Sequence, residues 1–258
     1  ELHGYAAHLK DTYGYDQLET LDADACHAMC PSPDYQGGIV DWGAAHLHPF
    51  AFALGLARAT RDAGASIHES SRATKIEHGT RTVVHTENGS VSADHVVLAC
   101  NGYLSGLAPG VTARVMPINN YVVATEPLGP ERQEDIIRGN HAVADSKFVV
   151  NYFRFSDDHR LLFGGTESYR YRFPRDIAGA VRQPLEEIFP QLKGVAITHG
   201  WGGTLGITMN RMPHFERVAG NILSLSGYSG HGVAMATLAG QIAAETIAGQ
   251  AERFDVMA

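Results

Sequence analysis

The hydrophobic and polar positions of the chain follow three patterns, and the first one extends to Gly102. Apolar positions at helical spacing begin at His48-Pro49 and stop near Gly64, which predicts a helix. Short β-type runs after this helix predict three strands, at 73–77, 82–87 and 94–100. Asn88-Gly89 between two of these runs favours a tight turn. The third run is short, apolar and β-branched, which is typical of a buried strand that leads into the loop at Asn101-Gly102.

The middle of the chain, from about Val115 to Thr208, has the pattern of an antiparallel sheet with a helix. The predicted elements are a strand at 121–125, a hairpin formed by 148–155 and 160–164, a helix at 177–189, and further strands over 195–208. Pro190 ends the helix, and Gly202-Gly203 is expected to interrupt the last strands. This is an α+β arrangement rather than an alternation of β and α units.

The last part of the chain returns to an α/β pattern. A strand at 221–226 leads into a glycine-rich turn at 227–232, and a long apolar helix then runs to Gly249. The opening residues, 1–33, are polar with helical patches. Two α/β parts therefore bracket an antiparallel part, which predicts a discontinuous domain with an inserted one.

The predicted fold class is α/β plus α+β. The expected domains are a linking helical segment at 1–38, a discontinuous domain at 39–112 and 214–258, and an antiparallel-sheet domain at 113–213. The chain begins at Glu1 without an initiator Met or a signal-peptide pattern, so we expect a fragment of a longer protein.

The composition argues against several classes of function. The 258 residues are 44% hydrophobic and 19% charged, which is typical of a globular protein with a sizeable core. The formal net charge of -8 disfavours binding to nucleic acids or to anionic membranes. No stretch approaches the roughly 18 apolar residues of a membrane span, so we expect none.

The three cysteines are Cys26, Cys30 and Cys100. This odd, sparse set argues against a disulfide framework and suits a reducing compartment, so we expect a cytoplasmic protein. The spacing of Cys26 and Cys30 suggests a metal pair, but a second ligand pair at zinc-site spacing is missing. We therefore expect no metal and interpret the pair as part of a helical turn.

The turn at 227–233 is the most informative candidate for a binding site. Its glycines let a ligand approach the backbone, and the helix that follows offers unpaired amides and the positive end of a dipole to a negative group. An ordinary glycine-rich helix start that packs under a sheet explains the turn as well. The strand and loop at 94–102 leave the same two alternatives. His231 lies at the helix start, where it either donates a neutral hydrogen bond or is solvated.

The predicted sheet of the middle part carries Tyr121, Tyr152, Arg154 and Trp201. One face of such a sheet can wall a pocket in which Arg154 binds a carboxylate through two parallel hydrogen bonds. The alternative is that the aromatic side chains belong to the core and that Arg154 lies at the surface. The sequence contains no serine-nucleophile elbow, Walker loop, metal-binding helix or dinucleotide-binding glycine fingerprint.

Taken in their order, several segments resemble the D-amino-acid oxidase (DAO) superfamily of FAD-dependent oxidoreductases. The matching segments are 40–49, 93–102 (ADHVVLACNG), 152–155 (YFRF), 160–165, 189–192 (FPQL), 201–213 and 229–233 (SGHGV). The tail at 249–255 (GQAERFD) is most similar to gamma-glutamylputrescine oxidases within that superfamily. The resemblance covers essentially the whole chain, and the order of the motifs makes the set specific although each motif alone is loose.

The resemblance implies a glutathione-reductase-like FAD-binding fold that lacks its N-terminal Rossmann unit and carries an inserted antiparallel-sheet substrate domain. It implies non-covalent FAD as the cofactor and a small-molecule amine as the substrate. The implied reaction is oxidation of a C–N bond by hydride transfer to flavin, followed by hydrolysis of the imine and formation of hydrogen peroxide. The oligomeric state stays open.

The resemblance also implies roles for particular residues. The implied cofactor-binding residues are Ala73, Thr74, Ala99, Cys100, Asn101, Gly102, Gly227, Ser229, Gly230, His231, Gly232 and Val233. The first two would meet the adenosine half of FAD, the next four its middle, and the last six the pyrimidine edge of the flavin. The substrate-side candidates are the four residues of the predicted sheet, and no catalytic residue is assigned.

Three departures from the family pattern matter. The N-terminal phosphate-binding unit is absent, so we expect the chain alone to bind FAD weakly or not at all and to be inactive. No Cys occurs at 203–208, where some relatives tether flavin, and no Lys occurs at 161–165, where some relatives activate oxygen. An electron acceptor other than oxygen, an amino-acid oxidase or dehydrogenase, and a non-catalytic binding domain therefore stay open as alternatives.

Overall fold

The computed structural model describes residues 2–169 and 172–258, so Glu1, the first residue of the predicted linking segment, lies outside the described residues. The chain divides into two compact units, each built from separated segments. Unit 1 consists of Glu1–His48, Asn120–Glu167 and Arg172–Gly202, and unit 2 consists of Pro49–Asn119, Ser168–Tyr171 and Gly203–Ala258. The domain boundaries proposed from the sequence stay a prediction.

Unit 1 begins with two helices and a two-stranded antiparallel ribbon. The elements are α1 (Leu2–Tyr13), β1 (Leu18–Leu21), α2 (Ala23–Met29) and β2 (Gly38–Asp41). Asp22 caps α2, because its side chain accepts a hydrogen bond from the Ala25 amide at 2.9 Å. The helical turn expected at Cys26 and Cys30 is confirmed. The sequence pattern does not predict the ribbon, because each of its strands is only four residues long and most of their side chains are not buried.

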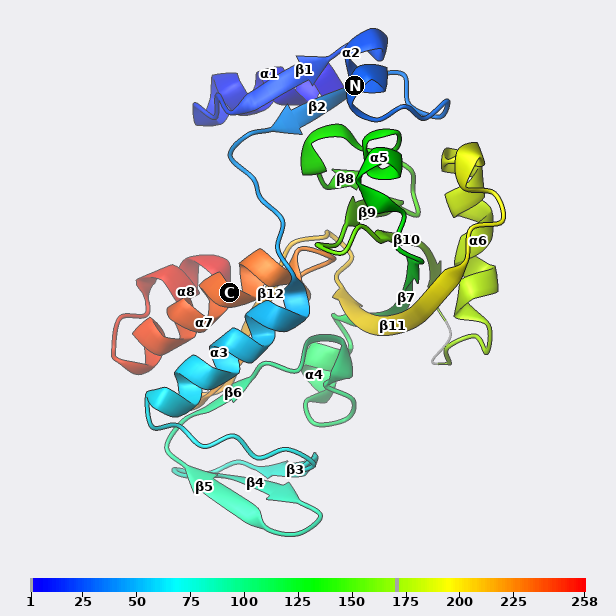
Figure 1. Cartoon of the computed structure of the whole chain (residues 1–258). Coiled ribbons are helices and arrows are strands. Elements are labelled where there is room, and N and C mark those ends of the chain that lie inside the picture. Colours follow the sequence, from blue (N-terminus) through cyan, green and yellow to red (C-terminus); the bar gives the residue numbers. More distant parts are fainter. Residues whose placement is uncertain (1, 170–171) are drawn as a thin grey trace. The chain divides into compact units, whose positions relative to one another are not determined.

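A five-stranded sheet lies mostly in unit 1, with the strand order β11-β7-β10-β9-β8 (Figure 1). Its strands are β7 (Met116–Thr125), β8 (Val143–Ala144), β9 (Tyr152–Phe155), β10 (Leu161–Ser168) and β11 (Ile197–Ile207). The predicted hairpin is confirmed, since β9 and β10 pair antiparallel. The predicted interruption at Gly202-Gly203 is wrong, because β11 runs through both glycines. A Cβ at Gly202 would overlap the Phe173 ring, so this glycine permits a close contact and does not end the strand.

One face of this sheet packs against α6 (Ile177–Ile188), which ends just before Pro190 as predicted. Asp176 caps α6 through a 2.8 Å hydrogen bond from the Gly179 amide. Apolar side chains of α6 and of the sheet form one buried cluster, in which the rings of Phe153 and Phe163 are stacked 5.7 Å apart. The remaining short helices of unit 1 are α5 (Gly129–Glu134), η2 (Arg138–Asn140) and η3 (Pro190–Leu192).

Unit 2 contains two three-stranded sheets. The first has the order β3-β4-β5, with β3 (Ala73–Glu77), β4 (Thr82–Thr86) and β5 (Ser90–Ala93). Its antiparallel pairing confirms the predicted strands and the turn at Asn88-Gly89. The second has the order β12-β13-β6, with β12 (His214–Ala219), β13 (Ile222–Ser226) and β6 (Val96–Leu98). Strand β6 runs parallel to β13 and is shorter than the predicted strand at 94–100.

Helices cover unit 2, and two of them pack on the β12-β13 pair. The helices are α3 (Pro49–Asp62), η1 (Asn101–Tyr103), α4 (Pro109–Thr112), α7 (Gly232–Ile247) and α8 (Glu252–Met257). Phe215 and Leu225 of the strands share a buried cluster with Ile242 of α7 and Phe254 of α8. Ile222 of β13 belongs to a second cluster that includes β6 and α4 side chains. The alternation along β13 therefore places apolar side chains on both faces of this sheet.

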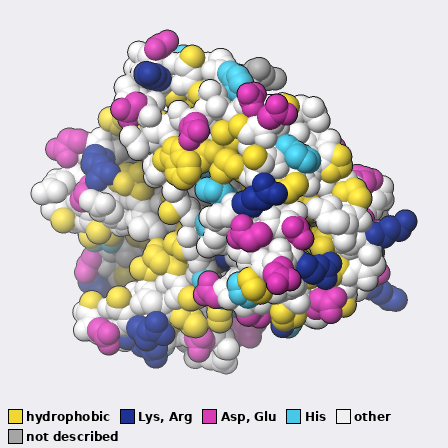
Figure 2. Space-filling view, turned by 45° about the horizontal axis from the view of Figure 1, so that its top comes forward, with side chains coloured by type: hydrophobic (Ala, Val, Ile, Leu, Met, Phe, Trp, Pro, Cys, Tyr) yellow, Lys and Arg dark blue, Asp and Glu magenta, His cyan; other side chains and the backbone are white. Residues whose placement is uncertain are grey.

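Apolar side chains are also common at the surface of unit 2. Helix α3 contains no buried residue, and the side chain of Phe50 at its start is 67% exposed. Figure 2 shows one face of the whole molecule and does not distinguish the units. On that face, hydrophobic side chains in yellow gather in patches, and Lys and Arg side chains are interspersed with Asp and Glu side chains.

Candidate functional site

The glycine-rich turn of unit 2 connects β13 to α7 and begins with a residue that only glycine suits. Gly227 has a φ of +71°, in the left-handed region. A Cβ at this position would lie 2.6 Å from Cγ2 of Thr208 and 3.3 Å from Cβ of His214. Both the backbone conformation and the close packing therefore require the glycine that follows the strand.

Alternate amides hold this turn in place. The Gly227 amide donates a 3.0 Å hydrogen bond to Oδ1 of Asn101. The Ser229 amide donates to the Gly206 carbonyl at 3.0 Å, and the His231 amide donates to the carbonyl three residues before it at 2.9 Å. The turn is thus attached to the loop after β6 and to the end of β11, and not only to its own helix.

The amides between these bonds remain available. The N–H groups of Gly230, Gly232 and Val233 make no hydrogen bond to any residue in the described ranges. Gly230 has a φ of +100°, and no atom lies within 4 Å of the position its Cβ would occupy. These free donors at the start of a 16-residue helix form a site that favours a negatively charged group.

The predicted segment 99–102 lies beside this turn, and two of its residues make close contacts within unit 2. Asn101 has a φ of +46° and binds the turn as described. A Cβ at Gly102 would lie 2.7 Å from the Leu205 carbonyl oxygen, so η1 contacts β11 directly. Ala99 is exposed, and burial raises the pKa of the free Cys100 thiol.

The other predicted cofactor residues belong to a different sheet or lack a fixed contact. Ala73 and Thr74 belong to β3, in a sheet separate from β6 and β13, and the Thr74 hydroxyl bonds to the His85 carbonyl at 3.3 Å. His231 is exposed at the start of α7, where its side chain makes no capping hydrogen bond. Their roles toward a cofactor stay predictions.

The substrate-side candidates are divided between the two faces of the five-stranded sheet. Phe153 and Phe155 of β9 point into the cluster under α6. The alternating residues of the same strand, Tyr152 and Arg154, therefore point to the opposite face of the sheet. Gly200 of β11 faces α6, since its Cβ would lie 3.4 Å from Ile177. The neighbouring Trp201, whose side chain is 45% exposed, therefore shares the face of Tyr152 and Arg154.

Tyr121 is separated from these three residues. It lies in the buried cluster on the α6 side of the sheet, where it is only 3% exposed and meets the Phe173 ring edge-on at 5.9 Å. Its hydroxyl has no hydrogen-bond partner within the described part of the chain. For Tyr121 the structure thus shows the core position that the sequence left open as an alternative.

Tyr152 is held firmly on the open face of the sheet. Its hydroxyl donates to Oδ1 of Asn120, and Nδ2 of Asn120 donates to the Thr166 carbonyl at 3.2 Å. A Cβ at Gly164, the cross-strand partner of Tyr152, would overlap the tyrosine ring. Burial raises the pKa of Tyr152 to about 12, so the phenol stays protonated near neutral pH.

Arg154 is half-buried next to this pair. One guanidinium nitrogen donates to the Phe155 carbonyl at 3.0 Å, and burial lowers the pKa of the guanidinium while Asp157 opposes that effect. A guanidinium has five N–H donors, so most of its donors remain for a carboxylate. Tyr152, Asn120 and Arg154 together can bind an amide and an anionic group.

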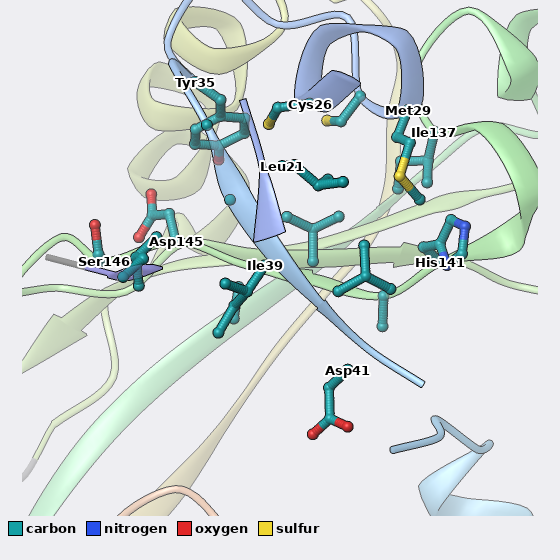
Figure 3. Close-up of a pocket in the computed structure, with 18 of the residues that line it drawn as sticks. Leu21, Cys26, Met29, Tyr35, Ile39, Asp41, Ile137, His141, Asp145 and Ser146 are labelled. Atoms are coloured by element: carbon teal, nitrogen blue, oxygen red, sulfur yellow. The ribbon is translucent and has the colours of Figure 1, made fainter. Parts of the chain in front are cut away.

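A cavity of about 540 Å³ lies elsewhere in unit 1, between 21–46 and 137–147. Figure 3 shows apolar side chains at its wall, among them Leu21, Met29, Ile39 and Ile137, with polar ones such as His141 and Asp145 at its rim. Asp145 is engaged by Asn151, whose backbone and side-chain amides both donate to it. None of the residues predicted for the cofactor or the substrate lines this cavity.

The described residues form neither a metal cluster nor a membrane-spanning helix. Within 2–169 and 172–258, no three or more His, Cys, Asp or Glu side chains are grouped so that they could hold a metal ion. None of the helices in these ranges has both the length and the apolar character needed to cross a membrane.

Several residues that contact the predicted site residues were not predicted from the sequence. Asn120, Gly164, Gly206 and Thr208 all contact predicted site residues. Gly164 at the end of the predicted strand at 160–164 was a usable signal, since glycine in a strand often marks a close approach. The contacts of Asn120 join residues distant in sequence, and no local pattern reports them.

Known proteins match nearly the whole length of this chain. The family profile described as "DAO: FAD dependent oxidoreductase" matches residues 1–246. The chain is 42% identical over 246 residues to the probable oxidoreductase OrdL of Rhizobium meliloti, covering 95% of this chain and 57% of that protein. It is 41% identical over 249 residues to the gamma-glutamylputrescine oxidoreductase of Escherichia coli, covering 96% and 58%. The chain therefore spans a little over half the length of these relatives.

Solved structures show the same fold. Glycine oxidase from Bacillus cereus is similar with a TM-score of 0.78 at 18% identity, covering 97% of this chain and 71% of that one. L-proline dehydrogenase from P. horikoshii is similar with a TM-score of 0.73 at 20% identity, covering 93% and 67%. Both likenesses are at 20% identity or below and concern the fold alone.

Proposed function

The chain belongs to the DAO family of FAD-dependent oxidoreductases, and from that premise we propose that it contributes to oxidation of the C–N bond of a gamma-glutamylated amine such as gamma-glutamylputrescine. The observation that carries the proposal is the turn of 227–233, where backbone amides are free at the start of α7. The substrate class comes from the relative that is 41% identical over nearly the whole chain.

The residues around this turn fit FAD. Bound FAD supplies the acceptor for a hydride taken from the carbon next to nitrogen. The free amides of Gly230, Gly232 and Val233 would hold a negatively charged part of FAD, and the open space at Gly230 would let a planar group approach. No Cys occurs at 203–208, so we propose that FAD binds non-covalently.

The open face of the five-stranded sheet supplies the substrate contacts in this proposal. A gamma-glutamylated amine carries its carboxylate far from the reacting carbon and has an amide between them. Arg154 binds that carboxylate, and the Tyr152–Asn120 pair binds the amide. The amine is oxidised to an imine, and water hydrolyses the imine to an aldehyde and ammonia.

The proposal has two versions, an oxidase and a dehydrogenase, which differ in their electron acceptor. With oxygen as acceptor, amine, water and oxygen give aldehyde, ammonia and hydrogen peroxide. The strand at 161–165 contains no Lys, so the second version, a dehydrogenase with another acceptor, stays open. Hydrogen peroxide formed per aldehyde distinguishes them, with one equivalent for an oxidase and none for a dehydrogenase.

The 258-residue chain by itself is proposed to bind FAD weakly and to be inactive. The glycine fingerprint that grips a pyrophosphate does not occur in its sequence, and this cradle supplies much of the affinity for a dinucleotide. The free amides of α7 can hold only one part of the cofactor.

The deciding experiment uses a longer protein that joins this chain to the region its relatives carry. The visible spectrum is recorded with FAD, and gamma-glutamylputrescine is then added without oxygen. Flavin bands that bleach support the proposed function. Bands that bleach only with alpha-amino acids replace the substrate with an amino acid. A protein that shows no flavin bands even with added FAD contradicts the enzyme proposal and leaves a non-catalytic binding domain.

A further inference from the structure

We propose that Asn101 is a positioning residue, which holds the turn of 227–233 so that the free amides of Gly230 and Gly232 face the bound cofactor. This inference rests on the proposed function, because it takes flavin as the group that meets those amides. Asn101 then acts through Gly227, and it does not contact the cofactor itself.

A hydrogen bond joins the loop that carries Asn101 to the distant turn that begins at Gly227. Oδ1 of Asn101 accepts from the Gly227 amide at 3.0 Å, across 126 positions of sequence. The loop that carries Asn101 is anchored separately, because the Tyr103 hydroxyl accepts from the Thr204 amide at 2.8 Å. The acceptor oxygen of Asn101 therefore belongs to a loop that is itself attached to β11.

The side-chain oxygen of Asn101 is covered by Gly206 of β11. A Cβ at Gly206 would overlap Oδ1 of Asn101, so this oxygen lies directly over the backbone of β11. Ser229 attaches the turn to the same strand, because its amide bonds to the Gly206 carbonyl at 3.0 Å. An oxygen enclosed by Gly206 and bonded to Gly227 is placed to fix the turn and not to bind a ligand.

Hydrogen-bonded and free backbone amides alternate along the turn. Bonds from Gly227, Ser229 and His231 fix every second amide, and the free amides of Gly230 and Gly232 lie between or just after them. The bond to Asn101 is the first of this series. Without it the Gly227 amide loses its partner, and the start of the turn is held by the pairing of Ser226 with His214 and by the bond from Oγ of Ser229 to the Gly227 carbonyl.

Three variants separate the acceptor from the backbone conformation at position 101. Asn101→Gly keeps the left-handed φ of +46° and removes the acceptor, while Asn101→Asp keeps both. Asn140→Gly is the matched control, because Asn140 also has a positive φ, of 56°, but lies in unit 1. Gly and Asp both tolerate this backbone region, so the variants differ in the hydrogen-bond acceptor and in the negative charge that Asp adds.

The primary measurement is amide hydrogen exchange of the chain, followed by mass spectrometry on peptides covering 226–233. Asn101→Gly is expected to speed exchange at Gly227 about five- to tenfold, which corresponds to the loss of one hydrogen bond. Asn101→Asp and Asn140→Gly are expected to stay within about twofold of the unmodified chain. Unchanged exchange in Asn101→Gly, or equally fast exchange in Asn101→Asp, overturns the proposal.

Titration with FAD, in the longer protein described above, separates this inference from the proposed function. Asn101→Gly is expected to weaken FAD binding about five- to tenfold, and Asn101→Asp is expected to restore most of it. Faster exchange with unchanged FAD affinity overturns the positioning role. Faster exchange in a protein that binds no FAD with any residue at position 101 supports the hold on the turn and contradicts the proposed function.

Discussion

Gly102→Ala gives the sharpest test of how closely the loop after β6 approaches β11. An added Cβ would lie 2.7 Å from the Leu205 carbonyl oxygen, 2.9 Å from its carbonyl carbon and 3.0 Å from the Thr204 carbonyl oxygen. All three atoms belong to the backbone, so no side chain can rotate away. The loop and the strand must therefore separate by about half an ångström, and overpacking of this kind is costly.

The expected loss of stability follows from two contributions. Overpacking against a backbone costs about 1–3 kcal/mol. Separation of the loop from β11 also weakens the bond from the Thr204 amide to the Tyr103 hydroxyl, which contributes about 1 kcal/mol. We expect Gly102→Ala to lower the free energy of unfolding by about 2–4 kcal/mol, measured by urea denaturation followed by circular dichroism.

Gly106→Ala is the matched control for this change. Gly106 lies four residues later in the same region, its φ is not in the left-handed range, and no atom lies within 4 Å of its Cβ position. Alanine there is expected to change stability by less than about 1 kcal/mol, and its smaller unfolded-state entropy can raise stability slightly. Equal effects of the two substitutions would refute the close approach of η1 to β11.

Three further changes test other parts of the fold. Burial raises the pKa of Tyr152 to about 12, so its contribution to stability is complete below pH 10 and is lost as the pH rises from 10 to 12; Tyr152→Phe should reduce the loss of unfolding free energy across that interval by up to about 2 kcal/mol, and an unchanged loss would contradict the burial of the phenol. Burial also raises the pKa of the Cys30 thiol to about 12, so only about one thiol in 10⁴ is ionised at pH 8. Iodoacetamide should therefore modify Cys30 only after denaturation, as read by peptide mass, and rapid labelling of the native chain would argue against the buried position. Phe254 is fully buried and stacks on Phe215 at 5.9 Å, so Phe254→Ala should lower the unfolding free energy by about 3–5 kcal/mol in urea, whereas Val256→Ala, at a position 85% exposed on the same helix, should change it by less than about 0.5 kcal/mol.

The elements predicted from the sequence are those with strong local signals. The turn at Asn88-Gly89 and the proline after α6 act through the backbone of their own residues, and both sit where predicted. The ribbon of β1 and β2 was not predicted, because its strands are short and their apolar positions do not alternate. Gly202-Gly203 gave a misleading signal, since a glycine pair is compatible both with a break and with the close contact that Phe173 makes.

The candidate site was predictable in its segments but not in its internal contacts. The turn of 227–233 is recognisable from its glycines and from the helix after it. The partner of Gly227 lies 126 residues earlier, and nothing in the local pattern identifies Asn101 as that partner. Tyr121 and Tyr152 were equivalent as sequence candidates, and only the parity of their strands in the sheet places them on opposite faces.

The turn divides its amides between two tasks. Gly227, Ser229 and His231 anchor the segment, and Gly230, Gly232 and Val233 remain for a ligand. The spacing of the anchoring contacts, set by Asn101 and Gly206, therefore determines the binding properties of this turn as much as its glycine content does.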